Sequence, residues 1–104
     1  MSESWFLEHS DAVIESIRCN GFESLEPQHQ LVYLLWILDY SIRNSGDLLA
    51  GDDLRNGYLN EGLVLAGDLS LCAVAEAFAK AQESGANGYY SSYEAAIEEL
   101  RKSA

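Results

Sequence analysis

The run LVYLLWIL, from Leu31 to Leu38, places eight apolar residues in a row in a chain of 104. Pro27 precedes the run where a helix can begin, because proline lacks the N–H that a first helical turn leaves unbonded. Gly46 follows where a helix can end in a left-handed residue. A helix that is apolar on nearly every side belongs in the middle of its domain. We therefore expect a buried central helix from Pro27 to about Asn44.

The remaining segments show helical patterning, with apolar residues three or four positions apart, and no run alternates long enough to indicate a strand. The expected helices span about residues 4–19, 53–66 and 69–84, followed by a last helix from Ser91. Asp68 is expected to cap the helix at 69–84, and Ser91 with Glu94 forms an S-x-x-E capping box. The stretch GANGYY supplies the turn between these two helices. The sequence thus predicts an all-α fold, a compact single-domain bundle of four to five helices over residues 1–104.

The charge of the chain is strongly one-sided. Six Lys and Arg face seventeen Asp and Glu, which gives a formal net charge of −11. Such a surface repels nucleic acid and anionic lipid and attracts basic proteins. The alternative is that the acidic composition only maintains solubility. The first residues form no signal peptide, and no apolar run reaches the length of a membrane span, so we expect a cytoplasmic protein that contacts no membrane.

Asp39 is the most conspicuous candidate for chemistry, because it follows the apolar run directly. Arg43 lies four residues later, and acid before base at this spacing favours a local ion pair. A general acid or base would need a second titratable group and a substrate site, which Arg43 cannot supply because it does not exchange its proton at neutral pH. We expect Asp39 to be structural. The alternative is a small ligand-binding or hydrolase-like protein with a pocket lined by Asp39, Tyr40 and Trp36.

Other residues with catalytic or metal-binding chemistry form no recognisable motif. His9 and His29 have no partner at metal-ligand spacing, so each is expected at the surface. Cys19 and Cys72 match no C-x-x-C pattern; the alternatives are one disulfide bridge and free, buried thiols, and we expect the free thiols. No serine lies in a G-x-S-x-G elbow, and no glycine-rich phosphate loop is present. We therefore expect no catalytic residue, no metal and no cofactor.

The segment LEPQHQLVYLLWILDYSIRNSG resembles the helical family typified by DNA mimic protein 19 (domain of unknown function 4375). In that family a helix that begins with proline carries a Trp and a Leu-Asp pair and ends in an Asn-Gly-rich turn. The matching positions here are Pro27, Leu35, Trp36, Leu38, Asp39, Ile42, Asn44 and Gly46. The segment YLNEGLVLAGDLSLCAVAEAFAKA is similar to the next two helices, so the likeness covers about residues 25–80. The resemblance implies a compact helical fold and, in one class of members, an acidic surface that imitates the DNA backbone.

Two groups of acidic residues could form such a surface. Glu8, Asp11 and Glu15 follow helical spacing, with steps of about 5 to 6 Å, comparable to the distance between neighbouring phosphates on one DNA strand. The alternative is that they form the solvated face of an amphipathic helix. The second group is expected in the irregular middle of the chain, where loops often carry function. It comprises Asp47, Asp52, Asp53, Glu61 and Asp68, of which the first four are expected to bind the partner.

These observations predict a small acidic binding protein that inhibits a basic partner and is not an enzyme. Two forms are expected: an immunity protein that neutralises a nuclease-type toxin, and a DNA mimic that blocks a DNA-binding protein. The immunity form is favoured, because such inhibitors are short, acidic and single-domain. No direct contact with nucleic acid is expected. The expected partner-binding residues are Asp47, Asp52, Asp53, Glu61, Glu8, Asp11 and Glu15.

Overall fold

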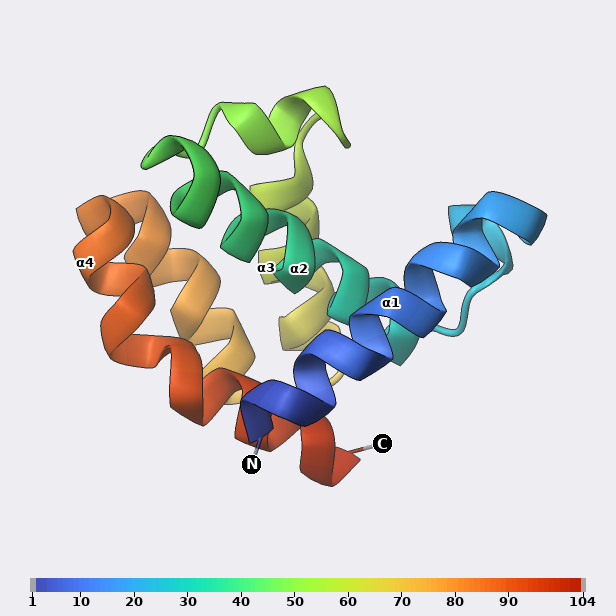
Figure 1. The fold of residues 1–104 in the computed structure, drawn as a ribbon. Helices are drawn as coiled ribbons and strands as arrows, with labels where there is room; N and C mark the ends of the chain where they lie inside the picture. Colours follow the sequence, from blue (N-terminus) through green and yellow to red (C-terminus); the bar gives the residue numbers. More distant parts are fainter. Residues whose placement is uncertain (1, 104) are drawn as a thin grey trace.

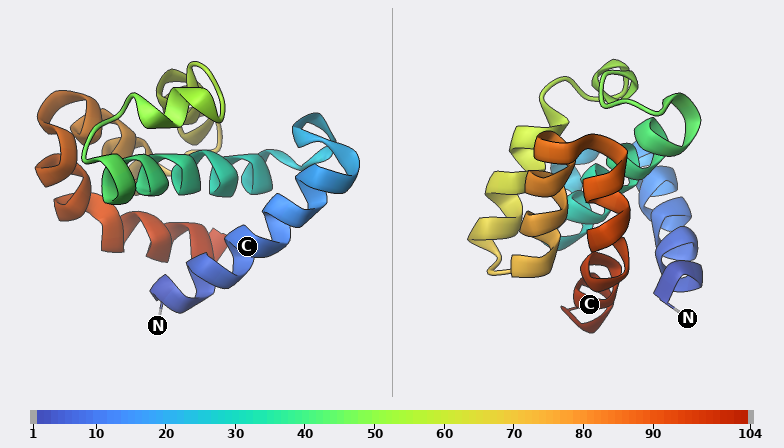
Figure 2. Two further views of the ribbon diagram at one scale, coloured as in Figure 1. Left: turned by 45° about the horizontal axis from the view of Figure 1, so that its top comes forward. Right: turned by 90° about the vertical axis from the view of Figure 1, so that its left-hand side faces the viewer.

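The computed structural model describes residues 2–103, which are helical over most of their length. Helix α1 spans Ser2–Asn20, α2 spans Pro27–Ser45, α3 spans Tyr58–Asp68 and α4 spans Cys72–Ser103, with 3-10 turns η1 at Phe22–Ser24 and η2 at Ala50–Asp53. Helix α2 contacts each of the other three α-helices (Figures 1 and 2). The described residues contain no strand. The predicted all-α bundle is confirmed.

Helix α2 is the central element that its apolar run predicts. Six of the eight residues in the run are at most 1% exposed, and the other two, Tyr33 and Trp36, are half-buried. Pro27 occupies the first helical turn, and Gly46 ends the helix in the left-handed region at φ 71°. The predicted start is confirmed, and the helix ends one residue beyond the predicted Asn44.

Helix α4 folds back on itself at Gly85, whose backbone (φ 64°, ψ −140°) is not helical. The two legs that result lie side by side (Figures 1 and 2). Gly85 alone makes the turn, because the rest of GANGYY is already helical. The predicted start at Ser91 is therefore wrong: Ser91 lies inside the second leg, where its hydroxyl donates to the Gly88 carbonyl at 2.8 Å.

The connection from α3 to α4 also differs from the prediction. Asp68 is the last residue of α3 and does not cap α4. The chain reverses through Ser70, at φ 59°, and the Leu71 N–H donates to the Ala66 carbonyl at 2.9 Å. The cap of α4 comes instead from its own second leg, because Glu99 accepts a hydrogen bond from the Val74 N–H at 3.0 Å.

The expected helix over 53–66 is displaced by a structured turn. Helix α3 begins only at Tyr58, because Gly57 before it adopts a left-handed conformation at φ 79°. The Asp52 carboxylate accepts a hydrogen bond from the Gly57 N–H at 3.2 Å and holds the turn. Upstream, the Asp47 carboxylate accepts bonds from the Leu49 and Ala50 N–H groups at 2.9 and 3.3 Å, which orders the entry to η2.

Candidate protein-binding surface

Every lysine and arginine of the chain lies in the described residues, and each is already engaged in an ion pair with an acid of the same chain. Five of these six pairs lie three or four residues apart along one helix. The pairs are Arg18–Glu15, Arg43–Asp39, Arg55–Glu61, Lys80–Glu76, Arg101–Glu98 and Lys102–Glu98. Within residues 2–103, no lysine or arginine is without an acid of the same chain within 4.0 Å.

Many acids, by contrast, remain exposed and have no lysine or arginine of the described residues within 4.0 Å. They lie on α1, η2, α3 and α4 and on the connections at the two ends of α2. They are Glu8, Asp11, Glu26, Asp47, Asp52, Asp53, Asp68, Glu83 and Glu94. The surplus negative charge therefore faces solvent, where it acts on an approaching partner.

The four acids predicted for the middle of the chain have different local roles. Asp47 and Asp52 hold the backbone around η2, as described above. Glu61 binds Arg55 through both carboxylate oxygens, at 2.6 and 3.0 Å. Asp53 is exposed, and no described residue is within hydrogen-bonding distance of its carboxylate. Asp53 is thus the member of this group whose charge is most available to a partner.

The acids predicted on α1 do not join this group. Glu8 and Asp11 are exposed, whereas Glu15 pairs with Arg18 at 3.3 Å. Helix α2 lies between α1 and η2 (Figures 1 and 2). The seven predicted binding residues therefore form two separate sets, and one partner surface of ordinary size need not reach both.

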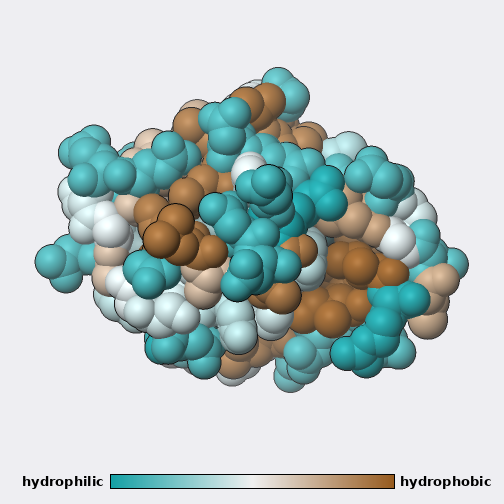
Figure 3. Space-filling view, turned by 90° about the horizontal axis from the view of Figure 1, so that it is seen from above, coloured by the Kyte–Doolittle hydropathy of each residue, from teal (hydrophilic) through white to brown (hydrophobic). Residues whose placement is uncertain are grey.

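Two exposed leucines beside η2 were not anticipated from the sequence. The side chains of Leu49 and Leu54 are 74% and 44% exposed. They flank Asp52 and Asp53 in the segment 47–54, which we call the η2 segment. Figure 3 shows the molecule from above the view of Figure 1, and on this face apolar residues lie among hydrophilic ones. The leucines of DLLAGDDL follow no helical period, which is a sign that they need not face the core. This sign does not predict exposure, because leucines in irregular segments are often buried.

Asp39 lies at the junction of α2 and α4, where it is buried. It is 7% exposed, and one carboxylate oxygen accepts hydrogen bonds from Arg43 Nε at 2.7 Å and from the Tyr89 hydroxyl at 2.5 Å. The Arg43 guanidinium also lies over the rings of Tyr90 and Tyr93, 5.4 and 5.1 Å from their centroids. The predicted Asp39–Arg43 pair is confirmed, and Tyr89 extends it into a contact between helices.

The hydroxyl of Tyr89 remains protonated far above the usual range. Burial, then the charge of the Asp39 carboxylate and the hydrogen bond to it, raise the pKa of Tyr89 well above its ordinary value of 10.0. Burial, then the charges of Asp39 and Glu3, raise the pKa of Tyr93 as well. Asp39 therefore binds a phenol that acts as a donor and not as a proton acceptor.

This arrangement predicts a loss of stability in alkali. Once the pH rises past about 10, an unfolded chain releases the Tyr89 proton, whereas the folded chain retains it. The folded state then binds more protons, so the free energy of unfolding falls by up to about 1.4 kcal/mol per pH unit for each such tyrosine. Urea unfolding at about pH 9, 10 and 11 checks this, and Tyr89→Phe should make the decline shallower. Equal slopes for the two proteins would contradict the assignment.

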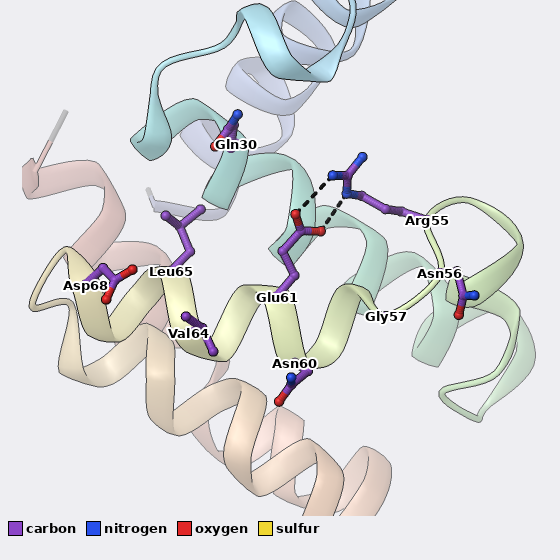
Figure 4. Close-up of a pocket in the computed structure, with 9 residues that line it drawn as sticks. All are labelled: Gln30, Arg55, Asn56, Gly57, Asn60, Glu61, Val64, Leu65 and Asp68. Atoms are coloured by element: carbon purple, nitrogen blue, oxygen red, sulfur yellow. Dashed lines mark hydrogen bonds and ion pairs between the residues drawn. The ribbon is translucent and has the colours of Figure 1, made fainter.

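A hollow of about 580 Å³ opens along the outer face of α3 (Figure 4). The paired side chains of Arg55 and Glu61 stand at one end, with Gln30 of α2 beside them, and Asp68 lies at the other end. Its remaining lining residues are Asn56, Gly57, Asn60, Val64 and Leu65. The hollow includes none of Asp39, Tyr40 and Trp36, which the alternative interpretation placed around a pocket.

The histidines and cysteines also differ from expectation. The rings of His9 and His29 meet edge to face at 5.7 Å, and both are half-buried rather than at the open surface. Cys19 and Cys72 are free, as predicted, but exposed, because each lies at the end of a helix that does not face the core. Within residues 2–103, no group of three or more His, Cys, Asp or Glu is placed to hold a metal ion.

Across the part of the chain that the structure describes, every helix is too short or too polar to cross a bilayer. Comparison of the chain with protein-family models, with curated proteins and with solved structures found no match.

Proposed function

We propose that this chain is a small acidic protein of the cytoplasm that binds and inhibits a basic protein partner and catalyses no reaction itself. One observation carries the proposal. All six lysines and arginines are bound to acids of the same chain, while many carboxylates remain exposed without a cation. A basic partner would supply positive charge to these carboxylates, and electrostatic attraction would accelerate its association.

The η2 segment is the part of the surface that fits this role best. Asp53 offers an unpaired carboxylate, and Leu49 and Leu54 offer exposed apolar side chains beside it. Protein interfaces combine apolar contacts at the centre with charged groups around them. Asp47 and Asp52 already fix the backbone of this segment, so the segment would lose little conformational entropy when a partner binds it.

Of the two inhibitor forms, we favour an immunity protein for a nuclease-type toxin over a DNA mimic. A mimic needs carboxylates repeated at phosphate-like spacing, and the candidate series on α1 is interrupted because Glu15 is neutralised by Arg18. An immunity protein needs only one surface that complements its toxin. The compact acid-and-leucine arrangement of the η2 segment suits that requirement.

The proposal is tested with two variants matched in charge and in apolar loss. Asp53→Lys with Leu49→Ser alters the η2 segment, and Glu94→Lys with Leu7→Ser makes the same changes at exposed positions elsewhere. Each protein is immobilised and used to capture partners from its native cell at two salt concentrations. We expect the wild type and the second variant to retain a stoichiometric basic nuclease, and the first variant to bind it at least about tenfold more weakly.

The captured protein is then assayed for cleavage of plasmid DNA with and without the chain. Inhibition at equal molar ratio supports the immunity form. A captured protein that binds DNA without cleaving it, and that duplex DNA displaces, supports the mimic. The proposal fails if no basic protein is captured at low salt, or if both variants bind it equally.

A further inference from the structure

The hollow along α3 directly continues the η2 segment, because Arg55, Asn56 and Gly57 follow Leu54 in the chain and form one end of it. Its volume of about 580 Å³ lies within the range of ordinary binding sites. A partner seated on the η2 segment would therefore also meet this hollow.

The end of the hollow near Arg55 is rigid before any ligand arrives. The Arg55 guanidinium lies 3.6 Å from the centroid of the Phe22 ring and binds Glu61 through Nε and Nη2. Gln30 is also fixed, because its side-chain amide donates to the Phe22 carbonyl at 3.3 Å. Arg55 Nη1 makes no hydrogen bond within the described residues.

The opposite end has a different character. Asp68 is exposed, and no described lysine or arginine lies within 4.0 Å of it. Val64, one helical turn before Asp68, is 55% exposed and offers an apolar surface. Asn60 and Asn56 are exposed amides, a group that can bind peptide N–H and C=O groups at the same time.

The charge of the hollow determines which charge a ligand bound there should carry. Glu61 neutralises Arg55, and Glu23 lies a further 3.5 Å from the same guanidinium, so Asp68 adds to a net negative environment. An anionic ligand would be repelled, and a purely apolar one would leave the amides unpaired. A basic peptide matches these groups: the amides of Asn56 and Asn60 can bind its backbone, Val64 can contact an apolar side chain, and Asp68 can bind a cation.

We propose, on the basis of the proposed function, that this hollow receives an extended segment of the basic partner, with an aliphatic side chain on Val64 and a lysine or arginine against Asp68. The distance along α3 from Glu61 to Asp68 is about 10 Å, which about three residues of an extended chain span. Asp68 gives the segment a direction, since its carboxylate has no lysine or arginine of the described residues within 4.0 Å, whereas Glu61 and Glu23 already share Arg55.

The test uses synthetic probes and needs no knowledge of the partner. The ¹⁵N-labelled chain is titrated with a capped hexapeptide of alternating lysine and valine, with its glutamate counterpart, and with spermidine. We expect the lysine peptide to shift the amide signals of α3 and the side-chain signals of Asn56 and Asn60, and to saturate them. Neither spermidine, which lacks the apolar groups, nor the glutamate peptide should do so.

Two variants and a matched control complete the test. Asp68→Asn and Val64→Ser should each weaken the peptide by about threefold, whereas Glu83→Gln, which removes an exposed charge on α4, should leave its affinity unchanged. The inference is overturned if the peptide shifts signals over all acidic faces as spermidine does, or if Asp68→Asn binds like the wild type.

The outcome is separable from that of the proposed function. Peptide binding in the hollow without capture of a basic partner would retain the hollow as a peptide site and reject the inhibitor. Capture of a basic nuclease whose affinity depends on Asp53 but not on Asp68 would retain the inhibitor and reject the peptide site.

Discussion

Replacing Gly88 by alanine is expected to lower the free energy of unfolding by about 2 to 3 kcal/mol, a large fraction of the total for a chain of this size. Gly88 lies on the second leg of α4, next to the backbone of Lys80 on the first leg. A Cβ atom built there would lie 2.8 Å from the carbonyl carbon of Lys80 and nearer still to its oxygen. The obstacle is backbone, which cannot move aside as a flexible side chain could.

The expected loss already includes the gain in helix propensity, because alanine is favoured over glycine inside a helix by about 1 kcal/mol. Gly67→Ala provides the matched control. Gly67 is also helical, and nothing lies within 4 Å of a Cβ added to it, so that variant should be more stable by about 0.4 to 1 kcal/mol. Thermal unfolding of both variants measures the difference. Equal midpoints would show that the legs of α4 separate without cost.

The elements that were predictable from sequence are those whose signals are local. Helix α2 was recognised because Pro27 and Gly46 mark its ends and the apolar run marks its burial. The Asp39–Arg43 pair was recognised because both partners lie on one helix, four residues apart. In both cases the physical cause is contained within the segment itself.

The elements that were missed depend on residues far away in the sequence. Glu99 caps α4 from 25 residues further along, so Asp68 looked like the only available cap. Tyr89 reaches Asp39 across 50 residues, and no pattern around either residue indicates the other. The hollow on α3 likewise needs Gln30 from α2, and its volume exists only when the two helices are packed together. Tertiary contacts determined these features, and helical periodicity carries no information about them.

Replacing Asp39 by alanine should produce the other large effect, a loss of about 2 to 3 kcal/mol in the free energy of unfolding. The variant leaves the buried hydroxyl of Tyr89 without its acceptor and Arg43 without its charge partner. Breaking a fully buried pair costs about 3 to 5 kcal/mol. The expected value is lower here because the Arg43 side chain is 42% exposed and water can solvate it. The melting midpoint should fall by roughly 10 °C or more.

The control for Asp39 is Glu76→Ala, which breaks an ion pair of the same spacing with Lys80 on an exposed helix face. Both partners there are about half exposed, at 48% and 58%, so the loss should stay under about 0.5 kcal/mol.

A double-mutant cycle then isolates the contact between helices. Asp39→Ala and Tyr89→Phe should together cost less than the sum of the two single changes, because they remove one shared hydrogen bond. Additive losses would mean that Tyr89 and Asp39 stabilise the fold independently. Asp39→Asn gives the last distinction, since a variant that melts like the parent but no longer inhibits the basic partner would move Asp39 from the framework of the fold into its binding surface.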